Sequence, residues 1–180
     1  GEVIDESTLS CHKTSTIKCA YEAKPVLSWK RGFLGVKNGF KVRSIPPHFD
    51  HIRKDAFHYA LFAHALAGPF NSSTGAPLDP EPRSVSGIAE RPGPDLMISL
   101  GLWRFDDPIP CIPGSTCSDQ TGTALVQAGT LMHELGHNLG LSHAGLFRFP
   151  NCGPNYPSVM NYLYQTRGLT DKDGFEHIDY

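Results

Sequence analysis

The stretch that decides how this 180-residue chain folds and functions is residues 130–143, with the sequence TLMHELGHNLGLSH. His133 and His137 are four residues apart, so on a helix both imidazoles project from the same side and can bind one metal ion. Glu134 lies about 100° round the helix from His133, close enough to reach a water molecule on that ion without being a ligand. We therefore expect Glu134 to be the general base of a metal-dependent enzyme.

A third imidazole, His143, follows six residues after His137 and would be too far along if the helix continued. Gly140 provides the break, because glycine adopts the left-handed conformation that ends a helix without steric cost. The chain can then turn back and bring His143 to the same ion. Three histidine ligands with a fourth position left for water are typical of a catalytic zinc site, since structural zinc sites use four protein ligands.

The opposite side of this helix carries apolar residues at three- and four-residue spacing, which predicts that it packs on the core. The residues of this stripe are Leu125, Ala128, Leu131 or Met132, Leu135 and Leu139.

The motif His-Glu-x-x-His-x-x-Gly-x-x-His resembles the zinc signature of the metzincin metallopeptidases. Members of that clan have a methionine-containing turn downstream, and residues 158–162 (SVMNY) fit, with Met160 seventeen residues after His143. The resemblance implies that Met160 forms an apolar floor under the imidazoles. Tyr162 matches a tyrosine of astacins, serralysins and pappalysin-like members, whose hydroxyl approaches the metal. Ala144, after the third histidine, fits a separate or pappalysin-like bacterial branch.

The resemblance, which covers about residues 39–164, also implies a fold of the α/β (α+β) class, and the length of 180 residues suits a single catalytic domain over residues 1–180. We expect an upper subdomain (39–143) with a twisted mixed sheet and two long helices above the cleft. An irregular lower subdomain (144–180) would hold the methionine turn, and residues 1–24 would be an irregular N-terminal segment. The apolar run 96–102 predicts a strand covered on both faces. Either this strand or the one predicted at 84–89 would line the cleft.

The second helix is predicted at residues 49–67, after Pro46-Pro47 and before Gly68-Pro69, from the spacing of its apolar residues. It would carry His48, His51, His58 and His64 in or beside it, which we interpret as surface or packed residues and not as a second metal site. A strand is predicted at residues 39–45.

Composition limits the partners. The net charge of −2 excludes a basic nucleic-acid surface, and no apolar run has the length of a membrane span. Five cysteines without a CxxC pair indicate disulfides, with Cys11–Cys19 and Cys111–Cys117 as short loops and Cys152 left over. Sequence leaves the connectivity open. Disulfides point to a secreted protein.

The sequence thus predicts a secreted, monomeric zinc endopeptidase acting on proteins or peptides, with Zn²⁺ held by His133, His137 and His143 and water activated by Glu134. Asp171, Asp173 and Gly174 resemble the start of a calcium-binding loop, but the distal glutamate of such a loop is absent. Calcium is therefore only a secondary expectation. The alternative is a catalytically silent or latent binding module of the same fold. An exopeptidase would need a charged group to hold a substrate terminus, and the sequence places none.

Overall fold

The computed structural model describes five parts of the chain, which are residues 26–39, 46–68, 83–103, 123–145 and 151–180. Its sheet forms around strand β5 (Asp95–Ile98), whose four side chains are all buried. β5 pairs in parallel with β2 (Tyr59–Phe62) and antiparallel with β4 (Gly87–Ala89), so the strand order is β2-β5-β4 and β4 is an edge strand. The strand predicted at 96–102 is confirmed as far as Ile98, and Leu100–Leu102 form a 3-10 turn.

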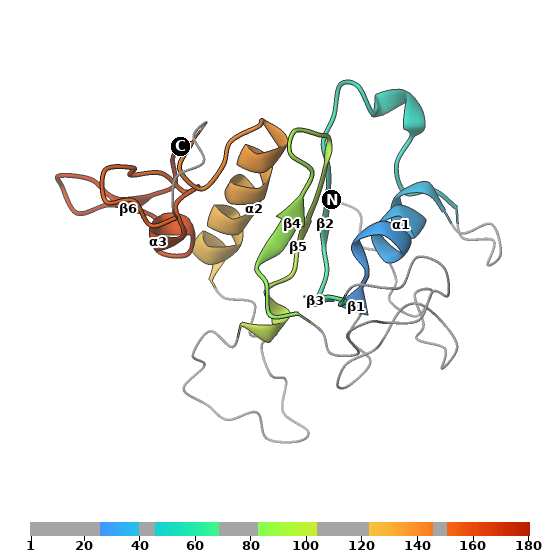
Figure 1. The fold of residues 1–180 in the computed structure, drawn as a ribbon, viewed down its shortest axis with the longest axis horizontal. Helices are drawn as coiled ribbons and strands as arrows, with labels where there is room; N and C mark the ends of the chain where they lie inside the picture. The colour runs from blue at the N-terminus through green and yellow to red at the C-terminus, as the bar shows by residue number, and fades with distance from the viewer. Residues whose placement is uncertain (1–25, 40–45, 69–82, 104–122, 146–150) are drawn as a thin grey trace, which may run out of the picture.

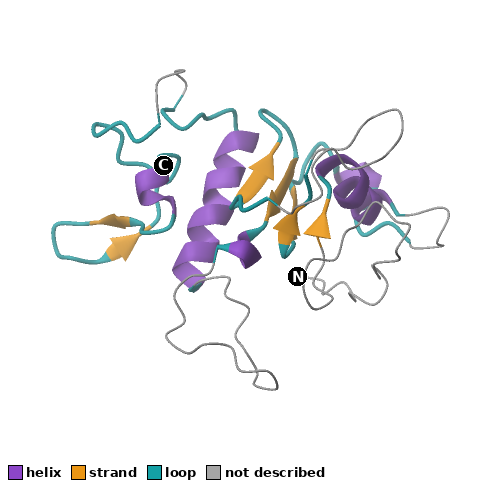
Figure 2. Cartoon of the chain, turned by 60° about the horizontal axis from the view of Figure 1, so that its bottom comes forward, coloured by secondary structure: helices purple, strands orange, loops and turns teal. Residues whose placement is uncertain are grey.

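Helices cover both faces of this sheet (Figures 1 and 2), with α1 (Leu34–Asn38) on one side and α2 (Ala124–Asn138) on the other. Successive side chains of β5 point to opposite faces, as in any strand. Met97 packs on the α1 side against Leu27, Phe33, Val36 and Leu66. Leu96 and Ile98 pack on the α2 side against Leu100 and Val126. The fold is therefore a mixed α and β arrangement, in agreement with the predicted class at this coarse level.

The helix predicted at residues 49–67 is wrong. This stretch forms a 3-10 turn at His51–Arg53, then β2, and then β3 (Ala65–Leu66), which pairs in parallel with β1 (Val26–Leu27). Tyr59, Leu61 and Ala63 pack against the cluster on the α1 side. Pairing with the buried β5 overrides the local helical spacing, because strand formation depends more on tertiary context than on local propensity. The helix on this side is instead α1, preceded by a π-helical turn at Trp29–Phe33, and neither was predicted.

Helix α2 begins where the hydroxyl of Thr123 accepts a hydrogen bond from the N–H of Val126, which is a standard N-cap. Leu131 and Leu135 pack against the sheet cluster, as the apolar stripe predicts. Leu139 does not continue the stripe: it follows the last helical residue and is 59% exposed.

The C-terminal part lies on the side of α2 away from the sheet and contains α3 (Tyr162–Gln165) and the hairpin of β6 (Leu169–Thr170) and β7 (Glu176–His177). In the hairpin turn, a carboxylate oxygen of Asp171 accepts hydrogen bonds from the N–H groups of Asp173 and Phe175. This turn accounts for the Asp171-Asp173-Gly174 pattern without calcium.

Several predictions fall on residues outside the described parts. These are the irregular segment 1–24, most of the strand at 39–45, and the disulfides Cys11–Cys19 and Cys111–Cys117. Cys152 is described and is a free, exposed thiol. None of the helices in the described parts is long and apolar enough to cross a membrane.

Candidate metal centre

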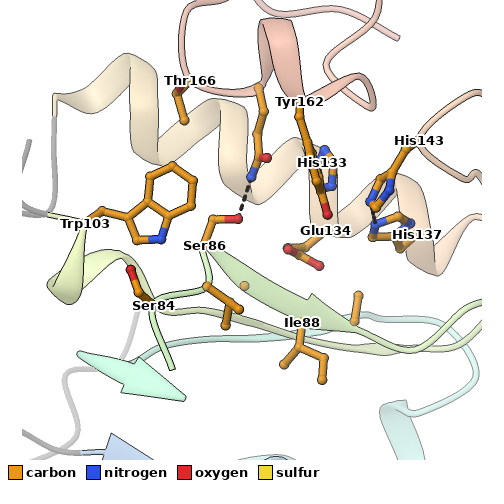
Figure 3. Close-up of a pocket in the computed structure, with 14 residues that line it drawn as sticks. Ser84, Ser86, Ile88, Trp103, His133, Glu134, His137, His143, Tyr162 and Thr166 are labelled. Atoms are coloured by element: carbon orange, nitrogen blue, oxygen red, sulfur yellow. Dashed lines mark hydrogen bonds between the residues drawn. The ribbon is translucent and has the colours of Figure 1, made fainter. Parts of the chain in front are cut away.

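The three predicted histidines come together in the structure. One nitrogen from each of His133, His137 and His143 lies within 4.8 Å of the others, and Nε2 of His137 is 3.2 Å from Nε2 of His143. Among the described residues this is the one group of three or more potential metal ligands. Among the described residues, His48, His51, His58 and His64 are not members of such a group. Figure 3 shows the three rings beside Glu134 and Tyr162.

The orientation of two rings is set by main-chain carbonyls. Nδ1 of His133 lies 2.9 Å from the carbonyl oxygen of Val159, and Nδ1 of His137 lies 2.8 Å from that of Leu141. Since a carbonyl only accepts hydrogen bonds, each Nδ1 carries the proton and each Nε2 keeps a free lone pair. Such a second hydrogen bond is the usual way in which proteins fix a metal-binding histidine.

The turn that returns His143 to the site is built on Gly140, which has φ +95°. The helix ends there, because the N–H of Gly140 donates to the carbonyl of His137 and the N–H of Leu141 donates to that of Gly136. Ser142 then exchanges two main-chain hydrogen bonds with Gly145, so His143 lies within a tight loop. The predicted helix break at Gly140 is confirmed.

Glu134 is 3% exposed and lies against the edge strand β4. A Cβ atom on Gly87 would be 2.6 Å from Oε1 of Glu134 and 2.6 Å from the carbonyl oxygen of Met97. Both distances are far below van der Waals contact. A glycine at this position of β4 is therefore what leaves room for the carboxylate.

Comparisons with protein-family models, curated proteins and solved structures gave no match. The assignment of the site therefore rests on its geometry and on the chemistry of its donors. Three imidazoles that each bring one ring nitrogen within 4.8 Å of the others form a donor set that suits Zn²⁺, for which histidine nitrogen is a common ligand. The described residues thus fit a metal ion with three protein ligands.

Met160 packs against α2, and Tyr162 lies beside the histidine group. Met160 is fully buried and packs against α2 at Gly136, where a Cβ atom would be 2.2 Å from its sulfur. The ring of Tyr162 is 4.2 Å from that of His143 and 5.5 Å from that of His133, measured between centroids. Tyr162 is half exposed, and burial followed by the charges of Glu134 and Cys152 raises the pKa of its hydroxyl. The resemblance implied that the hydroxyl of Tyr162 approaches the metal, and this stays a prediction.

An open pocket of about 450 Å³ adjoins the histidines and runs along β4. This identifies β4 as the strand on the cleft, a choice that the sequence left open between two strands. Ser86 and Trp103, which line the same pocket, belong to the two segments that the sequence offered for the cleft, whereas Gln165 was not predicted, because it comes from the distant C-terminal part. Asn138 was also missed: its amide donates to the carbonyls of Glu90 and Asp95 and so ties the end of α2 to the β4–β5 connection.

Burial also shifts the ionisation of the site residues. Desolvation lowers the pKa of His133 from 6.5 to about 4 and that of His143 to about 4, and it lowers the pKa of His137 as well. Desolvation raises the pKa of the Glu134 carboxyl from 4.5 to about 8. The rings therefore stay neutral, as metal ligands must be, while a nearby cation would offset the cost of ionising Glu134.

These shifts predict how the stability of the metal-free protein depends on pH. Because the folded-state pKa of Glu134 is raised, the folded chain binds more protons than the unfolded chain between pH 4.5 and 8, and stability falls as pH rises through this range. The lowered pKa values of His133 and His143 act in the opposite direction, so stability is lost as pH falls from 6.5 towards 4. Above pH 6.5 only the effect of Glu134 remains among these three groups.

We therefore expect the Tm of the chelator-treated protein to fall between pH 6.5 and 8.5, and the fall to be much smaller in Glu134→Gln. Differential scanning calorimetry at a series of pH values measures both slopes. Equal slopes in the two proteins would show that the Glu134 carboxyl is not the group responsible.

Proposed function

We propose that this protein is a zinc-dependent endopeptidase of the metzincin type. The observation that carries the proposal is the convergence of three imidazole nitrogens beside a buried carboxylate, at a pocket that follows the edge strand β4. The zinc ion, when bound by His133, His137 and His143, supplies Lewis acidity that polarises a carbonyl and acidifies water.

The edge strand offers a binding surface for an extended peptide. The N–H of Ser99 donates to the carbonyl of Ser86, and the N–H of Glu90 donates to that of Asp95, so these pairs are hydrogen-bonded across β4 and β5. Because hydrogen-bonded and non-hydrogen-bonded pairs alternate in an antiparallel ladder, Gly87 and Ala89 direct their main-chain groups away from β5. Both residues line the pocket. A peptide substrate would add there as a further strand.

Glu134 and Tyr162 have the chemical properties that peptide hydrolysis needs. The carboxylate of Glu134 would accept a proton from the attacking water and pass it to the leaving nitrogen, acting as base and then as acid. The hydroxyl of Tyr162 is a hydrogen-bond donor beside the rings, suited to the negative oxygen that develops on the attacked carbonyl. Secretion and action as a monomer remain part of the proposal and rest on the sequence.

The proposal is tested by incubating the full chain and one equivalent of Zn²⁺ with a mixture of unstructured peptides and identifying the products by mass spectrometry. We expect cleavage at internal bonds, loss of cleavage with a zinc chelator, and recovery when Zn²⁺ is restored. Cleavage that persists after the chelator has removed the metal would overturn the proposal. Stoichiometric zinc binding without any cleavage would overturn it too, in favour of a silent or latent binding module.

A further inference from the structure

A hydrogen bond crosses the pocket between its two walls. The side-chain amide of Gln165, at the end of α3, donates to the hydroxyl oxygen of Ser86, next to β4, at 2.8 Å. These residues are 79 positions apart in the chain. In Figure 3 this bond separates the pocket into two parts, with Glu134 and the histidines on one side and Trp103 and Thr166 on the other.

Gln165 is only 3% exposed although it lines the pocket, so its side chain is packed into the protein and does not reach out into solvent. Two contacts of its main chain hold it there. The N–H of Gln165 donates to the carbonyl of Asn161, and its carbonyl oxygen lies so close to α2 that a Cβ atom on Gly129 would be 2.2 Å away. The main chain of Gln165 can therefore not move away from the pocket unless α3 moves with it.

Asn161 in turn fixes the start of α3. It is fully buried; its side-chain amide donates to the carbonyls of Gly153 and Tyr156, and its side-chain oxygen Oδ1 accepts a hydrogen bond from the N–H of Leu163. The Gln165 end of the Ser86–Gln165 bond is thus carried by a helix whose start is held in place by a buried side chain.

The chemistry of the walls limits what can enter beside this bond. Apart from Glu134 and the three histidines, the described residues that line the pocket carry no charged side chain. A charged substrate group would lose its hydration there without gaining an opposite charge, which costs free energy. Side chains that enter the recess should therefore be uncharged.

We propose that the Ser86–Gln165 hydrogen bond is the floor of the recess that receives the substrate side chain next to the cleaved bond. The depth of the recess is set by Gln165, so the protein cleaves beside small, uncharged residues such as alanine and serine. This inference rests on the proposed function, because it concerns the substrate of the same site.

The test uses peptides that differ only at the two positions flanking the cleaved bond, with alanine, serine, leucine, phenylalanine or aspartate at each. The wild-type protein is expected to prefer alanine and serine at one of these positions. Gln165→Ala opens the floor and should raise the leucine-to-alanine ratio of kcat/KM at that position by about tenfold or more, since pocket size discriminates methylene groups by such factors. Ser86→Ala, which frees the amide to rotate, should change the ratio in the same direction by less.

Gln127→Ala is the matched control, because it makes the same substitution on α2 at a residue that does not line the pocket. Its peptide preference should equal that of the wild type. A binding measurement checks the result without catalysis: in the Glu134→Gln background, the fluorescence of Trp103 reports peptide binding, and Gln165→Ala should strengthen binding of the leucine peptide relative to the alanine peptide.

An unchanged ratio in Gln165→Ala, with a wild-type protein that cleaves, overturns the inference and leaves the proposed function intact. A wild-type preference for leucine or phenylalanine over alanine at both flanking positions overturns it equally. If the wild-type protein cleaves none of the peptides, it is the proposed function that fails.

Discussion

Glu134→Gln is expected to lower kcat for peptide cleavage by about 10²–10⁴-fold, the usual contribution of a positioned general base. The substitution keeps the size and shape of a side chain that is 3% exposed and removes only its ability to take up and release a proton. Zinc should remain bound at one ion per chain, because the three nitrogens that converge belong to other residues. Steady-state kinetics and metal analysis of the same preparation measure both quantities.

Glu176→Gln provides the control, since it makes the same change on the exposed strand β7, away from the pocket. It should cleave peptides at the wild-type rate. A Glu134→Gln protein that retained wild-type kcat would remove Glu134 from the mechanism and with it the main support for a hydrolase.

His143→Ala is expected to abolish the stabilisation that zinc gives to the protein. For the wild type, free zinc at a thousand times Kd adds about 4 kcal/mol to the free energy of unfolding, a rise of roughly 10 °C in Tm for a domain of this size. Removing one of three ligands leaves two nitrogens, and the Nε2 of His137 loses the neighbour that lies 3.2 Å away. Thermal unfolding with and without zinc, together with titration calorimetry, gives the result directly.

His177→Ala is the matched control, because this histidine is exposed on β7 and is not a member of the histidine group. Its Tm should rise with zinc as in the wild type. If His143→Ala still showed the full rise, the ion would be held elsewhere, and the three-histidine site would be wrong.

The metal centre could be predicted from sequence because its information is local. His133, His137 and Glu134 lie on adjacent positions of one helix, and a single glycine with positive φ is enough to bring His143 back. Helical geometry and the conformational freedom of Gly140 therefore determine the arrangement before any tertiary contact is known. The apolar residues of α2 that face the sheet follow from the same periodicity.

The parts that could not be predicted depend on contacts between distant segments. Residues 59–66 have a helical pattern of apolar residues, yet they contain two strands, because β5 is available as a partner for β2 and β1 for β3. Nothing near Gly87 in the sequence indicates that Glu134 will lie against it. The Ser86–Gln165 bond joins segments on opposite sides of the cleft, and only the folded chain brings them together.

Two glycines of α2, Gly129 and Gly136, lie where the helix has no side chain and neighbouring residues approach it closely. They are seven residues apart, hence on one side of the helix, and they contact Gln165 and Met160 respectively. The main chain of Gln165 and the side chain of Met160 therefore both pack against one side of α2, two turns apart. A side chain at Gly129 would displace Gln165 and leave the contact between Gly136 and Met160 unchanged, so under the proposed function peptide preference could change while the histidine group stays the same.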